Sequence, residues 1–156
     1  MGEDDQPHGP DAVRAVTAAD RSAWQKLWQG YQAFYRVDIP AAVSDETWRR
    51  LLDPAEPMWA ALAVTGGQAV GLVHWIRHRS CWTTGDYVYL QDLFVVPAAR
   101  GTGLGRRLIE HVYAAARAMD CARVYWLTHE TNLDAMKLYD RIADRPGFVQ
   151  YRKVLP

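Results

Sequence analysis

The sequence is most constrained at a glycine-rich turn that joins an apolar strand to an amphipathic helix. Pro97 ends the strand, and Arg-Gly-Thr-Gly-Leu-Gly follows at residues 100–105. Alternating glycines permit positive φ and let a ligand approach the backbone. The unpaired N–H groups of the first helical turn point at one spot, with the positive end of the helix dipole behind them. The turn therefore predicts an anion site, to which Arg100 and Arg106 can add charge-assisted hydrogen bonds.

Two other phosphate-binding motifs do not fit this turn. A P-loop ends in Gly-Lys-Ser or Gly-Lys-Thr, which is absent here. A dinucleotide-binding fingerprint has the spacing Gly-x-Gly-x-x-Gly after the first strand of its unit. The glycines here are Gly101, Gly103 and Gly105, and they lie about two thirds along the chain. A glycine-rich turn alone is also compatible with a purely structural role.

Hydrophobic periodicity predicts one α/β domain over residues 11–156, with a disordered tail at residues 1–10. The predicted order is β-α-α-β-β-β-α-β-α-β, a mixed (α+β) sheet flanked by helices. Thr17 with Asp20, then Ser44, Gly103 and Asn132 predict the helix starts. The expected strands are 12–16, 58–65, 69–78, 87–96, 123–128 and 148–154. The first helix is expected to start at Thr17 with Asp20 and to end before Pro40, and the other expected helices are 44–52, 103–118 and 133–142.

Seven tryptophans in 156 residues are an unusual content. Core and interface packing explains them most simply, and an aromatic-walled acceptor pocket is the sharper interpretation. Trp24, Leu27, Trp28, Tyr31 and Tyr35 recur at spacings of three and four, which predicts one stripe of an amphipathic helix. Exposed aromatics on the first two helices would also suit a homodimer.

Charge and hydropathy argue against several classes of partner. Lys plus Arg equals Asp plus Glu at 18 each, so no net charge draws the chain to nucleic acid or to an anionic membrane. No apolar run approaches the ~20 residues of a membrane span, and the acidic N-terminus is unlike a secretory signal. We therefore expect a cytoplasmic protein. We expect no metal site, because His74 and His78 lack neighbouring ligands.

Residues 12–154 resemble the GNAT superfamily of N-acetyltransferases. The motif Arg/Gln-x-x-Gly-x-Gly/Ala is matched by Arg100, Gly103 and Gly105. The sequences YLQDLFVVP before it, NLDAMKLY at residues 132–139 and PGF at residues 146–148 extend the match. The Trp-rich first helix is similar to one branch, which includes fungal enzymes that acetylate histones, polyamines or D-amino acids, and bacterial relatives.

This resemblance implies acetyl-CoA as cosubstrate and no covalent enzyme intermediate. The acetyl group would pass to a primary amine of a small molecule or a peptide by direct attack in a ternary complex. The Val95 N–H would polarise the thioester carbonyl. The implied acetyl-CoA-binding residues are Leu93, Phe94, Val95, Val96, Arg100, Gly101, Thr102, Gly103, Leu104, Gly105, Arg106, Asn132 and Ala135.

Tyr139 matches the family's leaving-group tyrosine, and the alternative is a core tyrosine beside Leu138. A phenol with a pKa near ~10 is less acidic than a thiol near ~8.5, so complete proton transfer is uphill by about 2 kcal/mol. A hydrogen bond that steadies the departing thiolate is therefore the favoured role. Asn132 has a second interpretation as a helix cap.

The general base is the least determined part of the site. This branch often has Glu-Asp in the central strand where this chain has Gln91-Asp92, and Gln is no useful proton acceptor. Asp92 and Glu130 are the main candidates, ahead of His74 and His129. Either carboxylate can instead be structural or bind a cationic acceptor.

Two other classes of function remain open in the sequence. A non-catalytic acyl-CoA-binding or sensing module would keep residues 100–105 and tolerate loss of Tyr139. A partner-binding domain would use the Trp-rich helix and bind no CoA. The presence of Tyr139 favours the enzyme.

Overall fold

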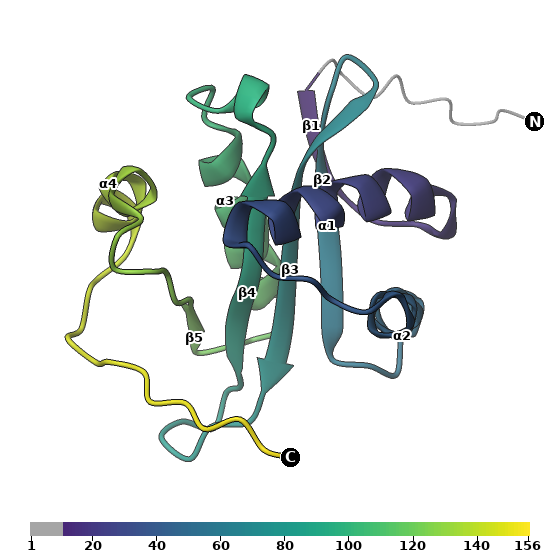
Figure 1. Cartoon of the computed structure of the whole chain (residues 1–156). Helices are drawn as coiled ribbons and strands as arrows, with labels where there is room; N and C mark the ends of the chain where they lie inside the picture. The colour runs from purple at the N-terminus through teal and green to yellow at the C-terminus, as the bar shows by residue number, and fades with distance from the viewer. Residues whose placement is uncertain (1–10) are drawn as a thin grey trace, which may run out of the picture. The chain divides into compact units, whose positions relative to one another are not determined.

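The computed structural model describes residues 11–156 and divides into two compact units after Trp126 (Figure 1). Residues 1–10, where we predict a disordered tail, lie outside the described residues. The first unit contains the sheet with three α-helices, and the second contains one α-helix.

The first unit is built on a sheet of five strands in chain order. They are β1 (Asp11–Ala15), β2 (Met58–Thr65), β3 (Gln68–His78), β4 (Tyr87–Val95) and β5 (Arg123–Tyr125). The first four pair antiparallel, whereas β4 and β5 pair parallel. The parallel pair requires a crossover helix, which α3 (Leu104–Ala118) supplies.

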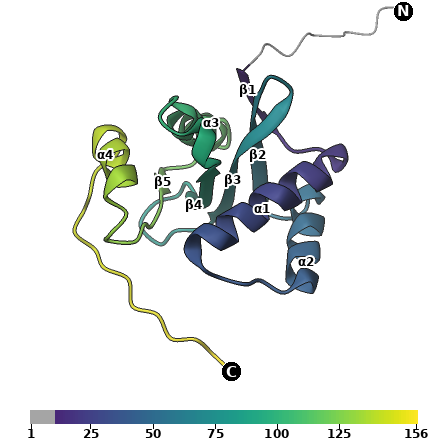
Figure 2. The same cartoon turned by 45° about the horizontal axis from the view of Figure 1, so that its top comes forward.

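Helices cover both faces of this sheet (Figures 1 and 2). α1 (Arg21–Tyr35) and α2 (Ala41–Leu52) lie on one face, and α3 lies on the other. Successive side chains of a strand alternate between faces. On β3, His74 accordingly contacts Trp24 of α1, while the next residue, Trp75, contacts His111 of α3.

The aromatic stripe of α1 forms the core on its side of the sheet, as its spacing predicts. Trp24 is fully buried, and its ring lies 5.0 Å from that of Trp48 on α2. The helix packs closely against β4 at Gly30, where a Cβ would stand only 2.8 Å from the Phe94 ring. The cluster consists of Trp24, Leu27, Trp28, Trp48, Leu51, Ala60, Leu62, Leu72 and Phe94.

A β-bulge interrupts the pairing of β3 with β4. Trp75 pairs with Leu90 and His74 pairs with Asp92, so Gln91 is the extra residue on β4. Because a bulge adds one residue to a strand, the side chains after it point to the opposite face of the sheet from the one that simple alternation would give. Asp92 consequently lies on the same face as Tyr89, against α1, and Gln91 is exposed.

An ion pair connects β1 to the start of α1. Both guanidinium nitrogens of Arg14 donate to the Asp20 carboxylate at 2.8 Å. The same carboxylate accepts the Thr17 N–H at 2.7 Å, and Thr17 and Asp20 form a capping box around the short 3-10 helix η1 (Ala18–Asp20). The predicted helix start is therefore confirmed, although α1 itself begins at Arg21.

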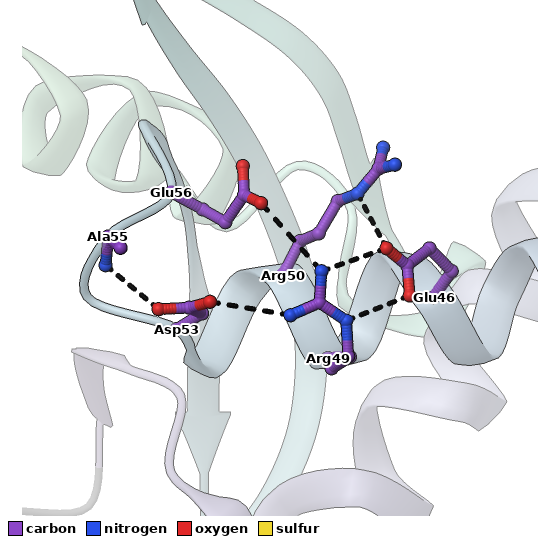
Figure 3. Close-up of polar contacts among 6 residues, drawn as sticks. All are labelled: Glu46, Arg49, Arg50, Asp53, Ala55 and Glu56. Carbon is purple, nitrogen blue, oxygen red and sulfur yellow. Dashed lines mark hydrogen bonds and ion pairs between the residues drawn. The ribbon is translucent and has the colours of Figure 1, made fainter.

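The end of α2 carries an exposed ionic network (Figure 3). Arg49 donates to Glu46 at 2.8 Å and to Asp53 at 3.3 Å, and Arg50 also donates to Glu46 at 2.9 Å. The Asp53 carboxylate accepts the Ala55 N–H in the turn that leads to β2. Solvent screens such pairs, so they contribute little stability each.

The second unit contains α4 (Leu133–Ile142), with the bounds that the sequence predicts. The expected strand at residues 148–154 is wrong, because residues 143–156 contain no helix or strand. Alternating apolar residues make a strand only where a neighbour supplies ladder hydrogen bonds. Phe148 and Tyr151 are exposed at 81% and 93%.

Three smaller expectations also need correction. The strand expected at 123–128 ends at Tyr125. Ser44 does not cap α2, which begins three residues earlier behind Pro40, and its buried hydroxyl instead accepts the Trp28 indole N–H at 3.1 Å. Asn132 stands at the N-cap of α4, but its side chain donates to the Thr128 hydroxyl at 3.1 Å rather than capping the helix.

Asp20→Asn should lower the free energy of unfolding by about 1–3 kcal/mol near pH 6. The hydrogen bond from Arg14 lowers the pKa of Asp20 to about 2. Its stabilisation is therefore complete above the ordinary carboxyl pKa of about 4 and is lost as the pH falls towards 2. Urea denaturation at several pH values should show the two proteins converging in acid. The exposed Asp45→Asn is the control, and an equal effect of both variants would contradict this role.

Candidate functional site

The glycine turn lies between β4 and α3 and has the backbone geometry of an open cradle. Gly101 and Gly103 have φ of 76° and 84°, and Gly103 is the N-cap of α3. A Cβ at either glycine would meet no atom within 4 Å, so the space beside both is empty of protein. The short 3-10 helix η2 (Pro97–Ala99), which we did not predict, precedes them.

The N–H groups of residues 101–106 have no hydrogen-bond acceptor among residues 11–156. Backbone bonding stops at the Arg100 N–H, which donates to Pro97 at 3.3 Å, and resumes at Arg107, which donates to Gly103 at 3.1 Å. Consecutive free amides at a helix N-terminus form an anion-binding site. The turn thus has the donors that a diphosphate requires.

The two arginines of the turn differ in their contacts. Arg100 donates from Nε to the Val95 carbonyl at 3.0 Å and stacks over the rings of Phe34 and Phe94. That bond uses only one of its five N–H donors and fixes the guanidinium beside the end of β4. Arg106 is paired with Glu110 one turn further along α3, at 2.9 Å.

The end of β4 has one unpaired edge within the sheet. β5 pairs only with Tyr87–Tyr89, so β4 continues beyond its parallel partner. The Val96 N–H donates to Val70 on the β3 side at 2.9 Å. Because successive residues of a strand point their N–H groups to opposite edges, the Val95 N–H points to the unpaired edge. An extended ligand arm could bind there through main-chain hydrogen bonds.

Asp92 is buried under α1 and accepts a hydrogen bond from His74 at 2.9 Å. Three phenols surround it. Burial, together with the negative charge of Asp92, raises the pKa values of Tyr31, Tyr35 and Tyr89. All three therefore stay protonated at neutral pH and present O–H donors.

In the second unit, α4 carries the other candidates on one side. Asn132, Ala135 and Tyr139 follow at spacings of three and four and so share a helix face. Tyr139 is half-buried, and Glu130 is exposed in the loop before the helix. His129 accepts hydrogen bonds at Nδ1 from the N–H and the hydroxyl of Thr131, so it has a structural role in that loop.

Neither a metal site nor a membrane span appears in the described part of the chain. Residues 11–156 contain no group of three or more His, Cys, Asp or Glu side chains that could hold a metal ion. None of the helices described there combines the length and the apolar composition needed to cross a bilayer.

Comparison with known proteins now identifies the family. The model of the acetyltransferase (GNAT) family matches residues 24–143. The chain belongs to the GNAT family. It is 38% identical over 143 residues to D-amino-acid N-acetyltransferase HPA3 of Saccharomyces cerevisiae, covering 90% of this chain and 89% of the yeast protein. The chain is thus an acyltransferase of the GNAT type.

Solved structures of GNAT proteins share its fold. Aminoglycoside N-acetyltransferase AAC(6')-Iy in complex with CoA is 19% identical, with a TM-score of 0.78 and coverage of 92% of this chain and 94% of the other. A ribosomal-protein-alanine N-acetyltransferase from Brucella melitensis is 20% identical, with a TM-score of 0.74 and coverage of 93% and 99%. These likenesses confirm the predicted mixed α/β fold.

Sequence reasoning missed the group around Asp92. The stripe containing Tyr31 and Tyr35 is visible in the sequence, but nothing in it indicates that these phenols reach a carboxylate on β4. His74 looks isolated in the sequence, and its pairing with Asp92 depends on the bulge at Gln91. The one available signal was that His74 and Asp92 are polar residues within largely apolar stretches of two neighbouring strands.

Gly103→Ala should weaken binding of coenzyme A about tenfold or more, since a Cβ would occupy the cradle and the strained φ would move the amides. Gly67→Ala is a matched control, because Gly67 has φ of 79° and equally open surroundings in the β2–β3 turn. Both variants should lose a similar ~1 kcal/mol of stability. Calorimetric titration measures the affinity, and equal affinity for both variants would contradict the cradle assignment.

Proposed function

We propose that this GNAT protein transfers the acetyl group of acetyl-CoA to the primary amine of a small molecule or a peptide. The observation that carries the proposal is the run of free amides at residues 101–106, beside glycines whose missing Cβ atoms leave open space. Those donors, with the positive end of the α3 dipole behind them, suit the diphosphate of coenzyme A. The unpaired edge of β4 at residues 93–96 suits the pantetheine arm.

Acetyl-CoA supplies the acetyl thioester, and groups of the protein supply the hydrogen-bond donors that the reaction needs. The amine must be neutral when it attacks, the thioester oxygen needs a donor as charge develops, and the departing sulfur needs a donor as well. We assign the oxygen donor to the Val95 N–H on the unpaired edge. We assign the sulfur donor to the Tyr139 hydroxyl, with Asn132 and Ala135 on the same face of α4.

Direct attack in a ternary complex is the proposed kinetic mechanism. The amine itself attacks the thioester, so the mechanism needs no nucleophilic side chain of the protein. Initial-rate measurements with both substrates varied should give intersecting double-reciprocal plots. Parallel plots would indicate a covalent acetyl-enzyme and would contradict the mechanism.

The similar proteins suggest which classes of amine to test first as acceptors. The yeast relative is a D-amino-acid N-acetyltransferase, and solved neighbours include aminoglycoside acetyltransferases. A panel of D- and L-amino acids, diamines, aminoglycosides and short peptides, read by release of the CoA thiol, would identify the acceptor. Binding of acetyl-CoA without turnover of any amine would favour a non-catalytic acyl-CoA-binding module.

The exposed aromatic side chains on α1 would suit a homodimer. Sedimentation of the protein would test that oligomeric state.

Tyr139→Phe should lower kcat by roughly 10²-fold while acetyl-CoA affinity stays nearly unchanged, because only the donor to the departing sulfur is removed. Steady-state kinetics and calorimetry measure the two quantities. Tyr151→Phe is the control, since Tyr151 lies in the same unit and is 93% exposed. An unchanged kcat for Tyr139→Phe would remove this tyrosine from the mechanism.

Asp92→Asn and Glu130→Gln separate a general base from a carboxylate that only binds the acceptor. Removal of the base should shift the acidic limb of the pH–rate profile as well as lower the rate. Removal of a binding or structural carboxylate should scale the profile down without moving it. The profile of kcat/KM for the amine, measured at saturating acetyl-CoA, distinguishes the two outcomes.

A further inference from the structure

A buried chain of hydrogen bonds connects three elements on the face of the sheet that α1 covers. The Trp24 indole N–H on α1 donates to Nε2 of His74 on β3 at 2.9 Å. Nδ1 of His74 lies 2.9 Å from Oδ2 of Asp92 on β4. The three residues are 0%, 5% and 7% exposed, so water does not replace these bonds.

Hydrogen-bond chemistry allows only one arrangement of protons in this chain. An indole nitrogen donates and cannot accept, so Nε2 of His74 must be the acceptor. The single proton of the neutral imidazole is then on Nδ1, where it donates to the Asp92 carboxylate. A second proton on His74 would place two N–H groups face to face at the buried Trp24 contact.

The groups around the chain agree with a neutral histidine beside a charged carboxylate. On α1, Trp28 contacts the His74 ring at 5.0 Å, and the titratable Tyr31 and Tyr35 face Asp92. On β4, Tyr89 also lies near Asp92. Two cations lie near these groups. Arg21 lies over the Trp24 ring, 5.4 Å from its centroid, and pairs with Asp45 on α2, and the charge of Arg100 acts on Tyr35.

We propose that Trp24 and His74 are positioning residues that keep Asp92 as a carboxylate, through a neutral imidazole protonated on Nδ1. Oδ2 is committed to His74, and Oδ1 is left to face the tyrosines and the acceptor. Asp92 then acts as a fixed negative charge that attracts the amine, and it passes no proton on to His74. This assignment of Asp92 rests on the proposed function, whereas the proton arrangement does not.

The proton arrangement can be measured without any enzymatic activity. Nitrogen-15 NMR of the histidine side chains, assigned with His74→Asn, should show Nδ1 of His74 protonated and Nε2 bare. A protonated Nε2, or an imidazolium at neutral pH, would overturn the proposal even if the enzyme were active.

Trp24→Phe removes the blocking N–H, and Trp28→Phe is its matched control. Both indoles are buried on α1, and the Trp28 N–H donates to Ser44 instead of to His74. Only Trp24→Phe should allow the Nε2-protonated tautomer of His74 to appear, with KM for the amine rising about tenfold. KM for acetyl-CoA should not change. Identical NMR spectra of His74 and identical KM values for the two variants would contradict the role of Trp24.

His74→Asn tests the contact with Asp92 independently of Trp24. The Asn amide nitrogen stands where Nδ1 stands and can still donate to Asp92, whereas His74→Leu cannot. We expect His74→Asn to recover at least about tenfold in kcat/KM for the amine relative to His74→Leu. Equal loss in both variants, with wild-type thermal stability, would show that the donated hydrogen bond does not position Asp92.

Discussion

The extra residue in β4 is the constraint on which the arrangement of the site depends. Without the bulge at Gln91, alternation would place Gln91 beside Tyr89 under α1 and turn Asp92 towards α3. With it, a carboxylate faces α1 and the amide side chain is exposed. The bulge therefore selects which of two adjacent polar side chains meets the tyrosines, and it lies directly before the strand end that leads into the glycine turn.

The aromatic helix α1 gives that carboxylate a defined environment. Its tryptophans form the core with α2 and also supply two directed N–H donors, one to His74 and one to Ser44. Packing and hydrogen bonding thus use the same side chains. A buried polar group that is fully paired stabilises one arrangement, whereas an unpaired one would favour several. Trp24 and Trp28 accordingly serve the core and bind polar partners at once.

Membership of the GNAT family agrees with the physical features of the first unit. The free amides at the start of α3 and the unpaired edge of β4 form a continuous main-chain surface, which depends little on side-chain identity. Proteins that share under 25% identity with this chain have the same fold. The hydrogen bonds around Asp92, by contrast, depend on the particular side chains Trp24 and His74.

The sequence by itself determined the element order as far as α4, the glycine turn and the bounds of α4, because these follow from local periodicity, capping and the conformational freedom of glycine. It did not determine the absence of a strand at residues 148–154, since a strand needs a partner. It also did not determine that His74 meets Asp92. Only the tertiary structure decided that pairing. Strand register and a one-residue bulge arise where two strands are in contact, and no local sequence pattern encodes them.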